Sequence, residues 1–324
     1  MYQLISDGGC DFSESEVKEH NITIVPFYIS FDQENYLMEG RDITKDEYFD
    51  RLVSEKKLFP KTSQPSPQDY IDKFQPFLEA GQDIILLTIS SKLSGSYASA
   101  VIASDMLRED FPDRTIAMID SLNVSVGQGL ILREMIKMRD AGFSLEDNVR
   151  ITEQVRGSAK VYFTLTTLEY LKKGGRVGPT TALVGGILGL SPILQVEDDG
   201  SVAQLDNVRG RKVALKLIEE AMVHALKDEV QNIEISIGQI QREDEAATFK
   251  KSAEAALDTE ISNPITCIGV TIGTHAGPGA LAFGYCRKFN AFENENEAVE
   301  KYGVACLVGA TDLTGDARKA EGAA

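Results

Sequence analysis

The sequence predicts an α/β fold with a largely parallel sheet in its first half and a mixed sheet covered by helices in its second half. Three observations predict it. At 324 residues the chain is long enough for about two domains. Strand and helix patterns alternate up to about residue 141. From about residue 161 the strands become closely spaced and include a hairpin signal.

In the first half, apolar runs alternate with segments of helical periodicity. The helix near 97–108 places Tyr97, Val101 and Leu107 on one face with small residues, as in a helix packed against a sheet. Alternation of this kind indicates an α/β layer. Strands are predicted at 2–6, 23–30, 84–89 and 115–119, and helices near 45–55, 67–80, 97–108 and 127–141.

The second half contains more strands. Asp199-Gly200 lies at the centre of 196–202 and predicts a hairpin turn. A domain boundary near Gly157 depends on this change of topology alone. Strands are predicted at 161–166, 191–197, 201–207, 234–239 and 266–272, and helices near 167–173, 212–226 and 243–257.

Composition excludes several classes of partner. The formal net charge of −17 is unfavourable for binding nucleic acid or an anionic membrane surface. The four cysteines are scattered, with no CxxC pair and no histidine at zinc-ligand spacing, so no metal site and no disulfide framework are predicted. The N-terminus enters a strand without a signal-peptide pattern, so a cytoplasmic location is expected. The cysteines are Cys10, Cys267, Cys286 and Cys306.

Small polar residues follow three of the predicted strands. Because the carboxyl ends of parallel strands meet at one edge of a sheet, these loops predict a shared ligand cleft. In the loop 90–97, hydroxyls and a glycine precede a helix, where backbone N–H groups can hold a carboxylate or phosphate. The alternative is that the residues only cap helices. The loops are Ser6-Asp7-Gly8-Gly9, Ser90-Ser91, and Asp120-Ser121 followed by Ser125 and Gly127.

Two stretches, 177–196 and 261–286, lack charged residues, but glycine and proline interrupt both, so neither is predicted to span a membrane. For 177–196 two interpretations remain: a buried helix followed by a strand, or a helix whose glycines let a lipid chain approach.

The sequence has only three histidines that could act in binding or catalysis. His20 and His224 lie in charged or helical surroundings and are expected at the surface. His275 follows the predicted strand 266–272 in a glycine-rich loop, which would present it to a cleft, and a pKa near neutrality would let it donate to an anion. The phosphate-loop, dinucleotide and nucleophile-elbow motifs are absent from the sequence.

Five fragments in matching order, spanning roughly 2–285, resemble the DegV family, the fatty-acid-binding proteins that serve bacterial fatty acid kinase. The resemblance implies a Rossmann-like α/β/α domain at 1–156, a mixed-sheet lipid-binding domain at 157–285 and a C-terminal extension at 286–324. A long-chain fatty acid would have its carboxylate at the domain junction. The fragments are Thr62-Ser63-Gln64-Pro65-Ser66-Pro67, the loop 89–97, Asp120-Ser121 with 125–129, Leu171-Lys172-Lys173-Gly174-Gly175-Arg176, and 275–280.

The same resemblance assigns roles to residues and implies a binding subunit without catalytic residues or cofactor, with the kinase on a separate protein. Arg209 matches an arginine that engages the kinase, with a solvated basic face as the alternative.

A second hypothesis for the function is a dihydroxyacetone-kinase-like subunit in which His275 holds a small carbonyl compound covalently. A third is a regulatory module whose partner senses the lipid. The carboxylate-binding candidates are Thr62, Ser63, Ser94, Gly95, Arg176 and His275.

Overall fold

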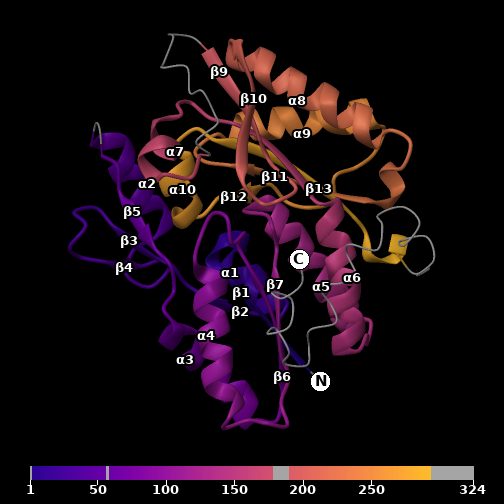
Figure 1. Ribbon diagram of the computed structural model, residues 1–324. Coiled ribbons are helices and arrows are strands. Elements are labelled where there is room, and N and C mark those ends of the chain that lie inside the picture. Colours follow the sequence, from indigo (N-terminus) through magenta and orange to yellow (C-terminus); the bar gives the residue numbers. More distant parts are fainter. Residues whose placement is uncertain (1, 56–57, 178–189, 293–324) are drawn as a thin grey trace, which may run out of the picture.

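The computed structural model describes residues 2–55, 58–177 and 190–292. Figure 1 shows a sheet flanked by helices in the lower half of the molecule and a second, larger sheet beneath two long helices in the upper half. The predicted α/β fold, with a parallel-sheet layer and a mixed sheet covered by helices, is confirmed.

The lower sheet is parallel throughout, in the order β2-β1-β6-β7. Along β6, Ile84 and Leu86 pack on one face while Ile85 and Leu87 pack on the other. A strand buried on both faces has a continuous apolar sequence, and helices cover both sides here. The elements are β1 (Tyr2–Asp7), β2 (Thr23–Val25), β6 (Asp83–Thr88) and β7 (Ile116–Asp120), with α3 (Pro67–Glu79) and α4 (Ser96–Arg108) on one face and α5 (Val126–Asp140) and α6 (Leu145–Ser158) on the other.

A small antiparallel sheet lies beside the lower sheet, at the left of Figure 1. The strand predicted at 23–30 was wrong in one respect, because Pro26 interrupts it and the two halves join different sheets. Proline cannot donate to a strand ladder, so a break there is expected. This sheet contains β3 (Tyr28–Ser30), β4 (Leu37–Met38) and β5 (Lys61–Ser63), next to α2 (Lys45–Ser54).

The upper sheet has the order β10-β9-β8-β13-β11-β12. All its pairs are antiparallel except β11 with β12. The predicted hairpin forms between β9 and β10, with Gly200 at a φ of 84°. Its elements are β8 (Lys160–Thr164), β9 (Leu190–Val196), β10 (Val202–Arg209), β11 (Ile233–Gln239), β12 (Thr266–Cys267) and β13 (Leu281–Arg287), covered on one face by α8 (Arg211–Leu226) and α9 (Glu243–Leu257).

The strand predicted at 266–272 was wrong. Only β12 is extended, and α10 (Val270–Ala276) begins three residues after it. The β-branched side chains of Val270, Thr271 and Ile272 favour a strand locally. Tertiary contacts decide otherwise, because carboxylates of Asp11 and Glu39 accept hydrogen bonds from the backbone at the start of this helix. Helix α6 and strand β13 were not predicted.

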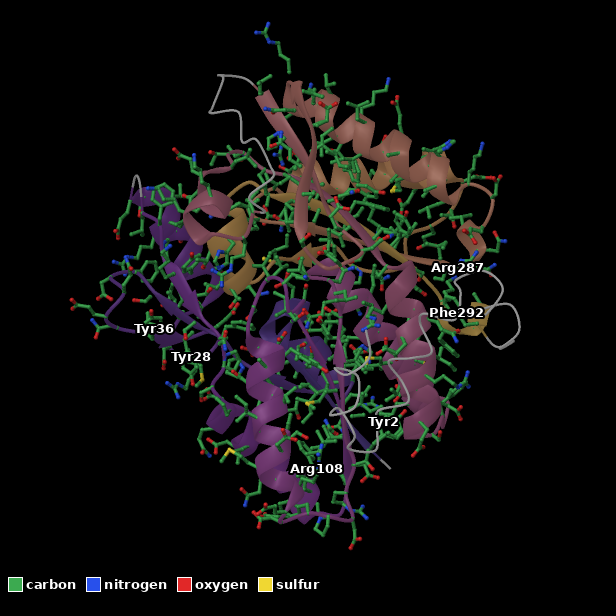
Figure 2. The ribbon with its side chains drawn as sticks, in the orientation of Figure 1. Tyr2, Tyr28, Tyr36, Arg108, Arg287 and Phe292 are labelled. Carbon is green, nitrogen blue, oxygen red and sulfur yellow. The ribbon has the colours of Figure 1, made fainter. Side chains whose placement is uncertain are left out.

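Short elements complete the described chain. Within it, no helix is long and apolar enough to cross a membrane. Phe292, at its end, is buried against the α5–α6 layer, and Figure 2 shows it beside α6. Residues 178–189 of the uncharged stretch, the extension from 293 onward and Cys306 lie outside the described residues. The short elements are η1 (Gly8–Cys10), α1 (Glu14–Glu19), α7 (Glu169–Gly174), η2 (Val230–Asn232) and η3 (Phe289–Phe292).

Candidate functional site

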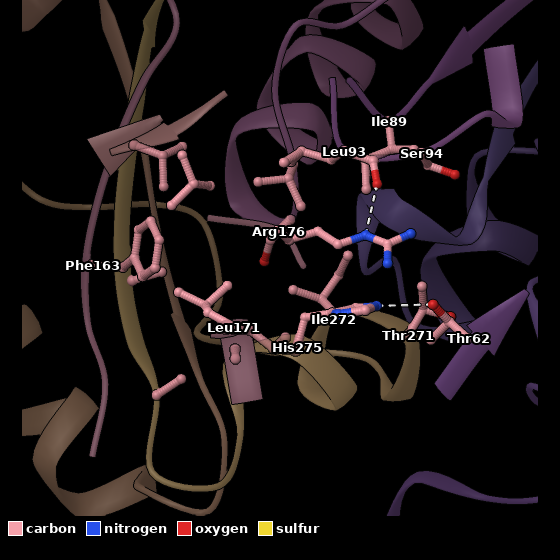
Figure 3. A pocket seen from close by; sticks show the side chains of 18 of the residues that line it. Thr62, Ile89, Leu93, Ser94, Phe163, Leu171, Arg176, Thr271, Ile272 and His275 are labelled. Atoms are coloured by element: carbon pink, nitrogen blue, oxygen red, sulfur yellow. Dashed lines mark hydrogen bonds between the residues drawn. The ribbon is translucent and has the colours of Figure 1, made fainter. Parts of the chain in front are cut away.

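A cavity lies between the parallel-sheet layer and the mixed sheet. It holds about 810 Å³ of unoccupied space, its open mouth included. Its lining is mostly apolar, with polar side chains gathered at one end (Figure 3). We call the set Thr62, Ser94, Arg176 and His275 the polar end of the cavity.

The polar end brings together residues from distant parts of the chain. Thr62 comes from β5 and His275 from the last turn of α10, and Thr62 Oγ1 lies 2.8 Å from His275 Nε2. Ser94 belongs to the loop between β6 and α4, and Arg176 follows α7. The fold therefore assembles four of the six predicted carboxylate-binding residues around one space.

His275 is held as a neutral ring. Burial lowers its pKa to about 3, and the nearby charges of Arg176 and Lys61 act in the same direction. The expectation of a pKa near neutrality was therefore wrong. The Nδ1 atom is buried and has no hydrogen-bond partner among the described residues. A Cβ on Gly174 would lie 2.2 Å from Nδ1, so only glycine allows this close approach.

Arg176 supplies positive charge. Its Nε donates to Leu93 O at 3.0 Å and its Nη1 donates to Gly174 O at 2.6 Å, so backbone carbonyls fix the guanidinium in position. Burial lowers its pKa. Among the ion pairs of the described residues none involves Arg176, and Figure 3 shows its guanidinium between Ser94 and His275. A half-buried cation without a carboxylate favours an anionic ligand.

Two further hydroxyls line the cavity but direct their protons away from it. Ser125 Oγ donates to Asp11 at 2.5 Å, and Thr271 Oγ1 donates to Glu39 at 2.5 Å. Burial raises the pKa of Asp11 to about 7. Ser125 and Thr271 can therefore offer lone pairs to the cavity but not a donor. Thr271 was missed because α10 was expected to be a strand; Gly269 and Gly277, which flank the helix at its two ends, are the signal that could have revealed it.

The remaining predicted residues lie outside the lining. Ser63 and Gly95 both contact Gln64, which does line the cavity: Ser63 Oγ donates to Gln64 O at 3.4 Å, and Gly95 leaves room for the Gln64 side chain, since a Cβ there would meet Gln64 Oε1 at 2.4 Å. Arg209 ends β10 and is exposed. His224 is exposed on α8, and His20 is half-buried at the end of α1.

The three strand-end loops lie next to one another, as predicted, but most of their polar groups form hydrogen bonds with one another. Asp7 is fully buried and accepts hydrogen bonds from Gly9, Ile89, Ser96 and Gln128. Ser90 donates to Gly200 O at the tip of the β9–β10 hairpin. From these loops the cavity receives the side chains of Ile89, Leu93, Ser94, Val124 and Ser125.

The apolar part of the cavity is built on the mixed sheet. Alternate residues of β8 face it, as do small residues at the start of β13, while α10 and α7 supply the opposite wall. These residues were not predicted to line the cavity, because β13 was missed and the faces of the other elements were not assigned from the sequence. They are Val161, Phe163, Leu165, Ala280, Ala282, Val202, Leu171, Ile272 and Ala276.

Comparisons with known proteins agree on one family. A family model described as an uncharacterised protein, DegV family, matches residues 1–288. A DegV domain-containing protein of Caldanaerobacter subterraneus is 33% identical over 282 residues, covering 86% of this chain and 95% of the relative. Another, from Clostridium perfringens, is 32% identical over 286 residues, covering 88% and 99%.

Solved structures are also similar over most of this chain. One is a stearic acid-binding protein from Eubacterium ventriosum, with a TM-score of 0.85 and 35% identity, covering 90% of this chain and 100% of that protein. Another is a DegV family protein from Thermus thermophilus described by its fatty acid binding, with a TM-score of 0.79 and 29% identity, covering 88% and 99%.

Proposed function

Because the chain belongs to the DegV family, we propose that it is a cytoplasmic, non-catalytic carrier that binds a long-chain fatty acid. The acyl chain lies in the apolar part of the cavity and the carboxylate lies at the polar end. The observation that carries this proposal is the half-buried Arg176, without a carboxylate partner among the described residues, at one end of a mostly apolar cavity.

The acyl chain and the carboxylate contribute differently to the free energy of binding. Each buried methylene contributes about 0.8 kcal/mol, so a long chain gains roughly 10 kcal/mol before ordering costs. A carboxylate removed from water costs several kcal/mol unless it is paired and hydrogen-bonded. Arg176 supplies the charge, while Ser94 and the Thr62–His275 pair supply donors. The tail therefore dominates affinity, and the head group decides orientation.

We further propose that a separate fatty acid kinase phosphorylates the bound carboxylate. Two features support this division: the cavity has an open mouth, and the sequence has no phosphate-loop motif. Exposed Arg209 is the candidate for docking the kinase. We expect Arg209→Ala to leave fatty acid affinity unchanged and to weaken acyl-phosphate formation with the kinase. Equal loss of both activities would refute a docking role.

A second candidate function rests on His275. Its ring is neutral and the residue lines the cavity, which makes it a candidate nucleophile toward a small carbonyl compound. The long apolar lining argues against it, because a small polar compound would leave that surface unfilled.

Mass spectrometry of the purified protein distinguishes the two candidates. For a carrier, a fatty acid is retained under native conditions and released on denaturation. A covalent adduct that survives denaturation and maps to His275 would support the carbonyl reaction instead. A protein that is empty and takes up neither added palmitate nor oleate would refute the carrier.

A further inference from the structure

One aromatic side chain stands on the mixed-sheet wall of the cavity. Of the residues that the described strands of this sheet contribute to the lining, Phe163 alone is aromatic; the others are Val161, Val202 and Ala282. Phe163 points into the cavity because it alternates with Tyr162, which packs on the opposite face of the sheet.

The neighbours of Phe163 are set by strand register. It pairs with Ala282 on β13 and with Leu194 on β9. Residues paired across adjacent strands have side chains on the same face, with Cβ atoms about 5 Å apart. Ala282 is therefore the small residue beside the ring, and any bulk added at Ala282 would occupy the space next to it.

Phe163 is also remote from the polar end. In Figure 3 it lies on one side of the cavity, with Leu171 and Ile272 between it and His275, while Ser94 and Thr62 lie on the other side. An acyl chain whose carboxylate is at Arg176 would run past Leu171 toward Phe163.

We propose that Phe163 sets the acyl-chain length that this protein selects, by closing the far part of the cavity, and that Ala282 leaves room for the last methylenes. This inference rests on the proposed fatty acid binding and specifies the substrate within that class. Phe163 and Ala282 contact the methyl end of the chain and take no part in binding the carboxylate.

Opposite substitutions at the paired positions should shift the selectivity in opposite directions. Each additional buried methylene strengthens binding about fourfold, the equivalent of about 0.8 kcal/mol. With Phe163→Ala, chains longer by about two carbons should gain roughly 15-fold relative to the wild-type optimum. With Ala282→Leu, long chains should lose a similar factor and shorter chains should become preferred, because overpacking excludes the last methylenes.

The experiment is a competition assay with saturated fatty acids of about 10 to 22 carbons, chosen because each methylene adds a step of affinity. Phe163→Ala and Ala282→Leu are compared with wild type, and thermal unfolding checks that each variant is folded. Phe163→Leu and Ala282→Val are milder replacements if either variant fails to fold. Tyr162→Ala is the matched control, since it removes an aromatic ring from the same strand on the other face, where it stacks on Tyr285.

We expect an upward shift of the preferred length for the Phe163 variants, a downward shift for the Ala282 variants and no shift for Tyr162→Ala. An unchanged length profile in both cavity variants, or the same shift in Tyr162→Ala, would overturn the role of Phe163 while leaving fatty acid binding intact. A wild-type protein that binds no chain of any length would instead refute the proposed function.

Discussion

Two clusters of polar groups include residues that follow β6 of the parallel sheet, and they differ in whether their central charge is bonded within the protein. The Asp7 carboxylate accepts hydrogen bonds from several buried donors: Ile89 N lies at 3.0 Å, Ser96 Oγ at 2.7 Å and Gln128 Nε2 at 2.9 Å from it. Gln128 Oε1, beside it, has no partner among the described residues. At the polar end, His275 Nδ1 has no partner among the described residues, and Arg176 forms no ion pair with them. A charge that is bonded within the protein ties loops together, whereas a cation without a counter-ion is suited to an anionic ligand.

Removing the bonded carboxylate of Asp7 should have the largest effect, and it should lower stability. Asp7→Ala leaves buried donors of Ile89, Ser96 and Gln128 unsatisfied, so the free energy of unfolding should drop by about 3 kcal/mol or more. Urea denaturation measures this loss. Asp7→Asn keeps the shape and one acceptor and should lose less. Normal stability with lost fatty acid binding would place Asp7 in the binding machinery and contradict the comparison.

Removing the charge at the polar end should affect binding instead. Arg176→Gln leaves the ligand carboxylate without its counter-ion, and truncating one partner of a buried charge pair costs about 2 kcal/mol or more, equivalent to a loss of about 30-fold in affinity. Displacement of a fluorescent fatty acid measures the change. Arg176→Lys retains the charge but not the planar fork, so its loss should be smaller. If Arg176→Gln binds as tightly as wild type, the carboxylate lies elsewhere.

A neutral donor should contribute less than the charge. Ser94→Ala removes one hydroxyl from the polar end, and we expect affinity to fall about tenfold, since a hydrogen bond to a charged group is worth about 1.5 kcal/mol. Ser91→Ala is the matched control, because Ser91 is exposed in the same loop and only its backbone N–H is bonded, to Asp120. Equal losses in the two variants would indicate that loop disturbance, and not head-group binding, is being measured.

The last prediction concerns the pH dependence of stability. Burial lowers the His275 pKa from 6.5 to about 3, so between these values the unfolded chain binds a proton that the folded chain does not. This contribution to stability is complete above about pH 6.5 and is lost as pH falls toward 3. Wild type should therefore lose more unfolding free energy than His275→Gln when the pH falls from about 7 to about 5.

The raised pKa of Asp11 has the opposite slope, because its stabilising effect is lost as pH rises from 3.8 through about 7. Asp11 is present in both proteins, so it cancels in the difference between them. Parallel stability profiles for wild type and His275→Gln would show that His275 titrates normally in the folded protein.

Local patterns determined the architecture. The apolar run 84–88 predicted β6 because a strand between two helical layers buries both faces. Asp199-Gly200 predicted the β9–β10 hairpin, because glycine readily adopts the positive φ that its turn requires. The hydroxyl-rich loop 90–97 and the Gly-Gly-Arg segment marked the carboxylate-binding candidates from sequence, and the fold brings Ser94 and Arg176 to one cavity.

Contacts between residues far apart in the chain decided the rest. Helix α10 begins where it does because Asp11 and Glu39, more than 200 positions away in the sequence, accept hydrogen bonds from the first backbone N–H groups of the helix. Local propensity cannot predict such distant contacts. The same helix carries His275 to Thr62 and buries it beside Arg176, which keeps the ring neutral. Sequence alone determined the layers and the residue types available for a head group. Only the tertiary structure decided which of them share a cavity, which remain unbonded, and that Phe163 faces its far part, since burial and bonding depend on neighbours that no local pattern specifies.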